Sequence, residues 1–328
     1  MTETTPQSPI GSGFTAATTA AEVVTNFDFG GASVIVTGGY SGLGFEVVKA
    51  LHSAGASVLV PARRPKEARN VLDAGGLEDV EVDTLDLADL DSVSAFADRY
   101  LASGRRLDVL VNNAAVMAAP LTRVGDGWES QFATNHLGHF ALTNRLWPRL
   151  GEAPASRVVE LSSSGHKLSP IRFDDLHFAN DADYNKWVAY GQAKTANSLF
   201  AVHLDALGRN DGVRAFAVHP GGIMTPLQRH LSREEMIVAG WMDDAGAVNE
   251  RFKSTEQGAA TTVWAATSPA LDGLGGVYPE DVDVALPTEI GSPEARIRGV
   301  DAPHAIDRDA AARLWAVSAE LTGLNVFA

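Results

Sequence analysis

Short apolar runs rich in β-branched residues alternate with longer helix-like segments along most of this chain. Strands are expected at 33–38, 57–62, 80–86, 107–115, 157–163, 213–222 and 275–279. Helical patterns fill 43–56, 89–102, 128–150, 190–209 and 255–267. Strands that are apolar throughout occur in parallel sheets that helices cover on both faces. The alternation therefore predicts an α/β fold built on a doubly wound parallel sheet.

No long polar linker divides the 328 residues, so a single domain is expected over 13–328. Residues 1–12 are rich in Thr, Ser, Pro and Gly and are predicted to be a disordered tail. A formal net charge of −15 argues against nucleic acid or an anionic membrane as a partner. No apolar run approaches the ~18 residues that span a membrane, and the first residues do not resemble a signal peptide. A cytoplasmic protein is therefore expected.

The chain contains no cysteine, which excludes disulfides, thiol nucleophiles and cysteine zinc sites. His136 and His139 lie three residues apart, but no carboxylate accompanies them at a ligand spacing. We therefore expect no metal and assign these histidines a structural or supporting role.

Polar and glycine-rich residues follow most of the expected strands. Ligands of doubly wound folds bind beyond the carboxyl ends of the strands. Those ends carry residues 38–44, 62–64, 86, 112–115, 162–164 and 220–222. A single binding edge is therefore predicted.

The stretch "VIVTGGYSGLG" places Gly38, Gly42 and Gly44 between a strand and a helix. Free backbone N–H groups and the helix dipole make such a junction an anion site, and glycine lets a pyrophosphate approach the backbone. The spacing differs from the Gly-x-Gly-x-x-Gly fingerprint. The alternative is a tight turn with close helix packing.

Tyr190 and Lys194, in "YGQAK", lie four residues apart and share one helix face. A phenol has an ordinary pKa of ~10, and a nearby ammonium lowers it. The pair is therefore a candidate general acid/base. The alternative is an amphipathic helix with one aromatic residue and one solvated lysine.

Several motifs occur in a fixed order. These are "TGGYSGLG" at 37–44, "NNAA" at 112–115, Ser163 after a strand, "YGQAK" at 190–194 and "HPGG" at 219–222. In this combination the chain resembles the classical short-chain dehydrogenase/reductase superfamily from about residue 13 to 328. The resemblance implies a Rossmann fold with a helical substrate lid at about 222–252 and a C-terminal extension.

The resemblance also implies roles for single residues. Tyr190 would be the catalytic acid/base, and Lys194 would lower its pKa and bind the nicotinamide ribose. Ser163 would orient the substrate, and Asn135 would belong to the proton relay. Ala115 replaces a glycine usual in the family. The expected cofactor contacts are Gly38, Tyr40, Ser41, Gly42, Leu43, Gly44, Arg63, Asp86, Leu87, Asn113, Ala114, Ala115, Tyr190, Lys194, Pro220, Gly221 and Ile223.

Ser163 and Tyr190 are 27 residues apart, about twice the interval common in the family. The insert at about 165–189 resembles that of the retinol-dehydrogenase-like and WW-domain-oxidoreductase-like branch. Segments 18–24, 275–285 and 305–323 resemble that branch too.

The second strand ends with Ala62 and is followed by Arg63 and Arg64. Members that use NAD carry an acidic residue there, whereas an arginine suits a 2′-phosphate. We therefore predict NADP (NADPH) as the cofactor, with Arg63 on the phosphate and Asp86 on the adenine amine. The alternative is a solvated basic turn.

The lid is rich in apolar side chains, and the insert adds Trp187. They predict a hydrophobic, fairly bulky ketone, aldehyde or alcohol as the small-molecule substrate, although these side chains equally suit plain packing. The lid residues concerned are Met224, Met236, Trp241, Met242 and Phe252. The expected enzyme is an NADP-dependent alcohol dehydrogenase or carbonyl reductase.

Two other functions fit the sequence less well. A non-catalytic NADP-binding redox sensor has no need for Ser163, Tyr190, Lys194 and Asn135 together. An epimerase or dehydratase of the same fold ranks last. The helices near 128–150 and 190–209 predict pairing into a homodimer or tetramer, unless the insert caps that surface.

Overall fold

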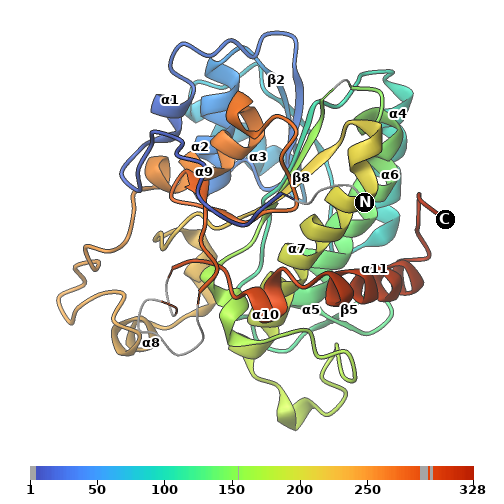
Figure 1. The fold of residues 1–328 in the computed structure, drawn as a ribbon. Helices are drawn as coiled ribbons and strands as arrows, with labels where there is room; N and C mark the ends of the chain where they lie inside the picture. Colours follow the sequence, from blue (N-terminus) through green and yellow to red (C-terminus); the bar gives the residue numbers. More distant parts are fainter. Residues whose placement is uncertain (1–4, 154, 289–294, 296–297) are drawn as a thin grey trace.

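Six parallel strands form the central sheet of the computed structural model, which describes residues 5–153, 155–288, 295 and 298–328 (Figure 1). Their order is β3-β2-β1-β4-β7-β8, so the chain winds outward in both directions from β1. The strands are β1 (Ser33–Val36), β2 (Ser57–Ala62), β3 (Glu81–Thr84), β4 (Val109–Asn112), β7 (Arg157–Leu161) and β8 (Arg214–Val218). The predicted doubly wound α/β fold is confirmed.

Helices cover both faces of the sheet, as continuous apolar strands require. On one face α2 (Gly42–Ser53) and α1 (Ala20–Val23) pack against α9 (Thr255–Thr267). On the other, α4 (Leu90–Ala102) packs against α6 (Gly138–Leu150), and α11 (Arg308–Thr322) lies across α7 (Lys186–Gly208). Each face has its own apolar core, one around Val36 and Trp264 and the other around Phe140 and Leu204.

The expected helix at 128–150 is divided. It begins as strand β6 (Trp128–Glu129), which pairs with β5 (Arg123–Val124). It continues through α5 (Ser130–Phe132), the π-helical turn η1 (Ala133–Leu137) and α6. Helix α3 (Pro65–Ala74) is additional to the expected elements.

Helix α7 begins four residues earlier than expected, at Lys186. Asn185 caps it, because its side chain accepts hydrogen bonds from the N–H groups of Trp187 and Val188. The expected last strand at 275–279 is reduced to a parallel bridge between Val277 and Phe216. The hairpin β9 (Pro279–Glu280) and β10 (Asp283–Val284) follows it.

The tail expected to be disordered is attached to the domain where the structure describes it. The Gln7 side chain donates to the carbonyls of Tyr278 and Ala285 and accepts from the Tyr278 N–H. The Asp283 carboxylate accepts from the N–H groups of residues 10–12. Composition did not reveal these long-range partners, and residues 1–4 lie outside the described residues.

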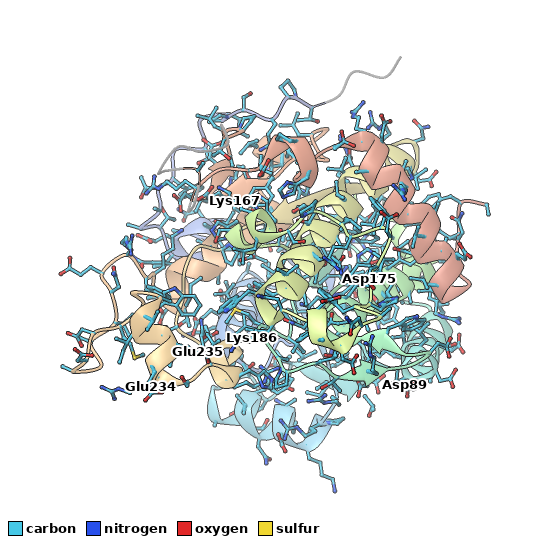
Figure 2. The ribbon with its side chains drawn as sticks, turned by 90° about the horizontal axis from the view of Figure 1, so that it is seen from below. Asp89, Lys167, Asp175, Lys186, Glu234 and Glu235 are labelled. Carbon is cyan, nitrogen blue, oxygen red and sulfur yellow. The ribbon has the colours of Figure 1, made fainter. Side chains whose placement is uncertain are left out.

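The insert and the lid contain only short elements. The insert holds the 3₁₀ turns η2 (Ser164–Leu168) and η3 (Asp181–Asp183), and the lid holds η5 (Pro226–His230) and α8 (Arg233–Val238). Figure 2 shows Lys186 and Glu235 beside each other, and their ion pair ties the start of α7 to the lid. The smaller elements are η4 (Arg209–Asp211), η6 (Pro269–Leu271) and α10 (Ala302–Ala305). Within the described ranges, no helix is both long and apolar enough to cross a membrane.

Candidate active site

Tyr190 and Lys194 lie on the buried face of α7, next to the carboxyl end of β7. Tyr190 is 5% exposed and Lys194 3% exposed. The Lys194 ammonium donates to the Leu161 carbonyl at 2.7 Å and lies 5.8 Å from the centre of the Tyr190 ring. Ser163 follows β7, and its hydroxyl lies close enough to Tyr190 to act on the phenol. The structure thus brings together the three residues that the sequence placed 27 and four positions apart.

Burial raises the pKa of Tyr190 to about 12, and the nearby Ser163 hydroxyl only partly offsets this. The sequence had predicted that the Lys194 ammonium would lower the pKa of Tyr190. The physical reason is that the ring is enclosed while the Lys194 amine is directed at the Leu161 carbonyl. Tyr190 therefore holds its proton at neutral pH.

Burial also lowers the pKa of Lys194 to about 8, and the nearby carboxyl group of Glu160 acts in the opposite direction. Glu160 is itself 1% exposed, and burial holds its pKa well above the ordinary value. The Asn112 amide donates to one Glu160 oxygen at 2.9 Å. The other oxygen has no hydrogen-bond partner in the described part of the chain.

Asn135 lies in the π-helical turn, a feature often found at functional sites. Its side chain accepts from the Val116 N–H at 2.8 Å and donates to the Val116 carbonyl at 2.9 Å. Asn135 thereby joins the loop after β4 to the π-helical turn that leads into α6.

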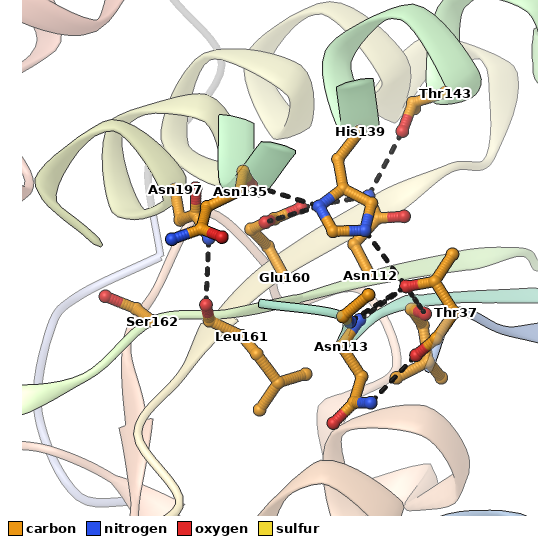
Figure 3. Close-up of polar contacts among 12 residues, drawn as sticks. Thr37, Asn112, Asn113, Asn135, His139, Thr143, Glu160, Leu161, Ser162 and Asn197 are labelled. Atoms are coloured by element: carbon orange, nitrogen blue, oxygen red, sulfur yellow. Dashed lines mark hydrogen bonds and ion pairs between the residues drawn. The ribbon is translucent and has the colours of Figure 1, made fainter. Parts of the chain in front are cut away.

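His139 links the π-helical turn at Asn135 to Thr37, which precedes the glycine loop (Figure 3). The Thr37 hydroxyl accepts from the N–H groups of Asn113 and Ala114 and lies 2.9 Å from His139 Nε2. His139 Nδ1 is 3.0 Å from the Asn135 carbonyl, so the ring is neutral with its proton on Nδ1. Burial lowers its pKa to about 4. Asn135 and His139 are four residues apart, so helical periodicity could have predicted that they lie close together.

The glycine loop supports both interpretations of its sequence. Gly44 is required for packing, because a Cβ there would lie 2.4 Å from the Gly38 carbonyl oxygen. Helix α2 begins at Gly42, whose φ of 51° favours glycine. Among the described residues, Ser41 makes no side-chain cap to this helix and the first turn has no acidic residue. The first N–H groups of α2 therefore suit a pyrophosphate.

Three arginines from two segments lie at the end of β2. Arg63 and Arg64 follow Ala62, and Arg64 pairs with Glu67 at 3.0 Å. Arg229 of η5 comes from the lid, and burial and the nearby positive charges of Arg63 and Arg64 lower its pKa. In the part of the chain that the structure describes, no carboxylate pairs with Arg63 or Arg229. Arg229 could not be recognised from sequence patterns, because it lies 166 positions from Arg63 along the chain.

The remaining expected cofactor residues also lie at strand ends. The Asp86 carboxylate accepts from the Ala88 N–H at 3.0 Å. Asn113 donates from its side chain to the Thr37 carbonyl. His219 Nδ1 lies 3.3 Å from the Ser164 N–H nitrogen, which connects the segment before Pro220 and Gly221 to the loop after β7.

A chain of aromatic rings leads from Tyr190 into the lid. The ring centre of Trp187 lies 6.4 Å from that of Tyr190 and 5.9 Å from that of Trp241. The ring centre of Trp241 lies 5.8 Å from that of Phe252. Met117, Leu227 and Leu231, which the sequence did not single out, join this cluster. Of the apolar lid residues expected from the sequence, Trp241 and Phe252 belong to this group of side chains. Met224, Met236 and Met242 do not.

Several known proteins are similar to this chain in sequence or fold. A family described as short chain dehydrogenase matches residues 32–174. A probable oxidoreductase of Streptomyces lividans is 44% identical over 299 residues, covering 89% of this chain and 98% of that protein. Retinol dehydrogenase 12 of Mus musculus is 36% identical over 305 residues, covering 92% and 89%. A solved structure of an uncharacterized protein from Mycobacterium paratuberculosis is 32% identical, with a TM-score of 0.69 and coverage of 95% and 99%.

These relatives align along nearly the whole chain, and the fold has the strand order and the glycine-rich first turn of a dinucleotide-binding sheet. The chain therefore belongs to the classical short-chain dehydrogenase/reductase family and is an oxidoreductase.

Proposed function

We propose that this chain is an NADP-dependent oxidoreductase that interconverts a hydrophobic ketone or aldehyde and the corresponding alcohol. The observation that carries the proposal is the buried Tyr190, with the Ser163 hydroxyl close to it and Lys194 one helical turn away. A phenol that keeps its proton at neutral pH is suited to donate it to a substrate oxygen.

In reduction, the Ser163 hydroxyl and the Tyr190 phenol bind the carbonyl oxygen of the substrate. Bound NADPH supplies the hydride that the carbonyl carbon accepts. Tyr190 gives its proton to the carbonyl oxygen, so the product is the neutral alcohol. Lys194 lies in reach to return a proton to the phenolate, with Asn135 and a water completing the path. The protein contributes position and charge rather than new covalent bonds.

The choice of NADP rests on the arginines at the end of β2. Arg63 has no carboxylate partner in the described residues, and Arg229 approaches from the lid. Placing like charges together costs free energy unless an anion offsets it, and a 2′-phosphate is such an anion. Initial rates with NADPH and NADH test this choice directly, and a clear preference for NADH would reject it.

The substrate class rests on the apolar cluster beside Tyr190. Trp187, Trp241, Leu227, Leu231 and Met117 surround the phenol with apolar surface. The name of the relative retinol dehydrogenase 12 indicates that it acts on a bulky hydrophobic alcohol. A cytoplasmic location and a homodimer or tetramer stay predictions, and α11 covers part of α7, one of the helices expected to pair.

The proposal is tested with a panel of hydrophobic ketones and aldehydes, followed through NADPH absorbance. Tyr190→Phe should reduce kcat by at least about a thousandfold, because the proton donor is lost. NADPH binding, measured by fluorescence, should be unchanged. Tyr184→Phe is the matched control, because Tyr184 is a half-buried phenol of the insert that binds the Ala119 carbonyl. Turnover by Tyr190→Phe at the wild-type rate would contradict the proposal.

A further inference from the structure

His166 is buried in the turn that follows Ser163, with 0% of its surface exposed. Its Nδ1 lies 2.6 Å from the Ser163 carbonyl oxygen, and its Nε2 accepts from the Asp301 N–H at 3.0 Å. A backbone N–H can only donate, so Nε2 carries no proton. The proton is therefore on Nδ1 and is donated to the Ser163 carbonyl.

The backbone of His166 is held as firmly as its ring. The His166 carbonyl accepts from the Thr195 hydroxyl of α7 at 3.0 Å and from His304 Nε2 at 2.8 Å. The Tyr278 hydroxyl lies 3.3 Å from His166 Nδ1. One residue thus receives contacts from α7, from the segment before β9 and from residues 301–304.

These contacts reach the Ser163 hydroxyl through the peptide units between Ser163 and His166. The hydroxyl accepts from the Gly165 N–H at 3.0 Å, so its position depends on where that N–H lies. Gly165 has no free space, because a Cβ there would lie 2.7 Å from the Tyr190 ring. A small shift of the turn would therefore move the serine hydroxyl relative to the phenol.

We propose that His166 is a positioning residue for Ser163, and that the segment Asp301–His304 takes part by holding the His166 ring and carbonyl. The inference rests on the proposed function, because it assigns a role in that reaction. Both bonds of the ring need a neutral imidazole, and the enclosed site keeps it neutral.

Two substitutions of His166 distinguish the hydrogen bond made by Nδ1 from the one made by Nε2. In His166→Asn the amide nitrogen replaces Nδ1 and still donates to the Ser163 carbonyl. In His166→Gln the amide oxygen replaces Nε2 and still accepts from Asp301, but the donor to Ser163 is lost. We expect kcat of the asparagine variant to fall only about threefold, because it loses the bond from the Asp301 N–H but keeps the donor to the Ser163 carbonyl. We expect kcat of the glutamine variant to fall about ten- to a hundredfold, as a misplaced catalytic group does, while the KM for NADPH is unchanged.

A second pair tests the C-terminal segment. Asp301→Pro removes the N–H that His166 Nε2 accepts, and the φ of −77° at this position is compatible with proline. Asp301→Asn keeps the N–H and a side-chain oxygen that can face His304 Nδ1, which lies 3.5 Å from the Asp301 carboxylate. We expect kcat to fall for the proline variant, by about as much as for His166→Asn, and not for Asp301→Asn.

Hydrogen exchange of residues 163–166 gives a readout that does not depend on turnover. The Gly165 amide should exchange faster in His166→Gln than in His166→Asn or the wild type. Wild-type kcat and wild-type exchange in His166→Gln would overturn the inference. Absence of carbonyl reduction by the wild type would instead refute the proposed function, and the exchange measurement would still decide the role of His166.

Discussion

Lys194 and Glu160 are two ionisable side chains enclosed beneath Tyr190, at the carboxyl end of β7. Enclosure disfavours charge on both groups, and each favours charge on the other. Lys194 keeps one hydrogen bond, to the Leu161 carbonyl, and its pKa of about 8 lies close to working pH. A lysine with this pKa can exchange protons with Tyr190 near neutrality, which an ordinary lysine does poorly.

The pH profile of the reductive reaction should report this lysine. Below about pH 8 Lys194 is an ammonium and can return a proton to Tyr190, whereas above it the proton is lost. We therefore expect kcat/KM for carbonyl reduction to decline as the pH rises through about 8. A profile that stays flat to pH 9.5 would contradict this assignment.

Glu160→Gln is the companion variant, since a glutamine oxygen can still accept from Asn112. Removing the carboxylate removes a charge that favours the ammonium, so the falling limb should move to lower pH. An unchanged limb would mean that Glu160 is protonated in the free enzyme.

At the scale of elements, η5 connects segment 222–252 to the glycine loop and to the end of β2. Thr225 and Pro226 start the turn and lie against the glycine loop, since a Cβ at Gly42 would be 3.1 Å from Thr225 Cβ. One turn later Arg229 lies near Arg63 and Arg64. A phosphate bound there would contact β2 and the lid at once, so that cofactor binding would also order the lid.

Substitutions of the three arginines should have unequal effects on the KM for NADPH. Charge-assisted hydrogen bonds are worth about 1.5–3 kcal/mol, so Arg63→Ala and Arg229→Ala should each raise it by about ten- to a hundredfold. Kinetics with NADH should change little, because NADH has no 2′-phosphate. Arg64→Ala is the control, since Glu67 already pairs with Arg64. Equal loss with NADH and NADPH in Arg229→Ala would indicate a general lid defect instead.

At the scale of the whole molecule, buried histidines make the free energy of unfolding depend on pH. Burial lowers the pKa of His136, His166 and His219 to about 3 and that of His139 to about 4, against an ordinary value of 6.5. These rings stay neutral in the folded chain under conditions in which the unfolded chain takes up protons.

The free energy of unfolding should therefore fall as the pH drops from about 6.5 toward 4. The unfolded state binds more protons over this window, and each histidine contributes up to about 1.4 kcal/mol per pH unit. Urea unfolding followed by circular dichroism at pH 7.5, 6 and 5 would measure the slope. His136→Gln, which can still bond the Ser318 hydroxyl, should flatten it. A stability that does not change between pH 7.5 and 5 would refute this prediction.

Local patterns in the sequence were sufficient for the six strands of the sheet and for the candidate side chains that meet at the end of β7. The apolar runs locate the strands because both faces of a parallel sheet are buried, and the order of the motifs identifies the family. Ala62 and Arg63 lie at the end of β2, where the sequence placed them. Gly44 lies in the first turn of α2 and Tyr190 in α7, helix positions that spacing alone could specify.

Tertiary structure decided whatever depends on contacts between distant segments. The π-helical turn at Asn135, the arrival of Arg229 beside Arg63 and the attachment of Gln7 to Tyr278 join residues far apart in the chain. The direction of the Tyr190 pKa shift was wrong from sequence, because helix spacing brings Lys194 near but does not reveal how deeply the ring is enclosed. Periodicity reports which face of an element is buried, whereas desolvation and hydrogen-bond partners depend on what the folded chain packs against that face.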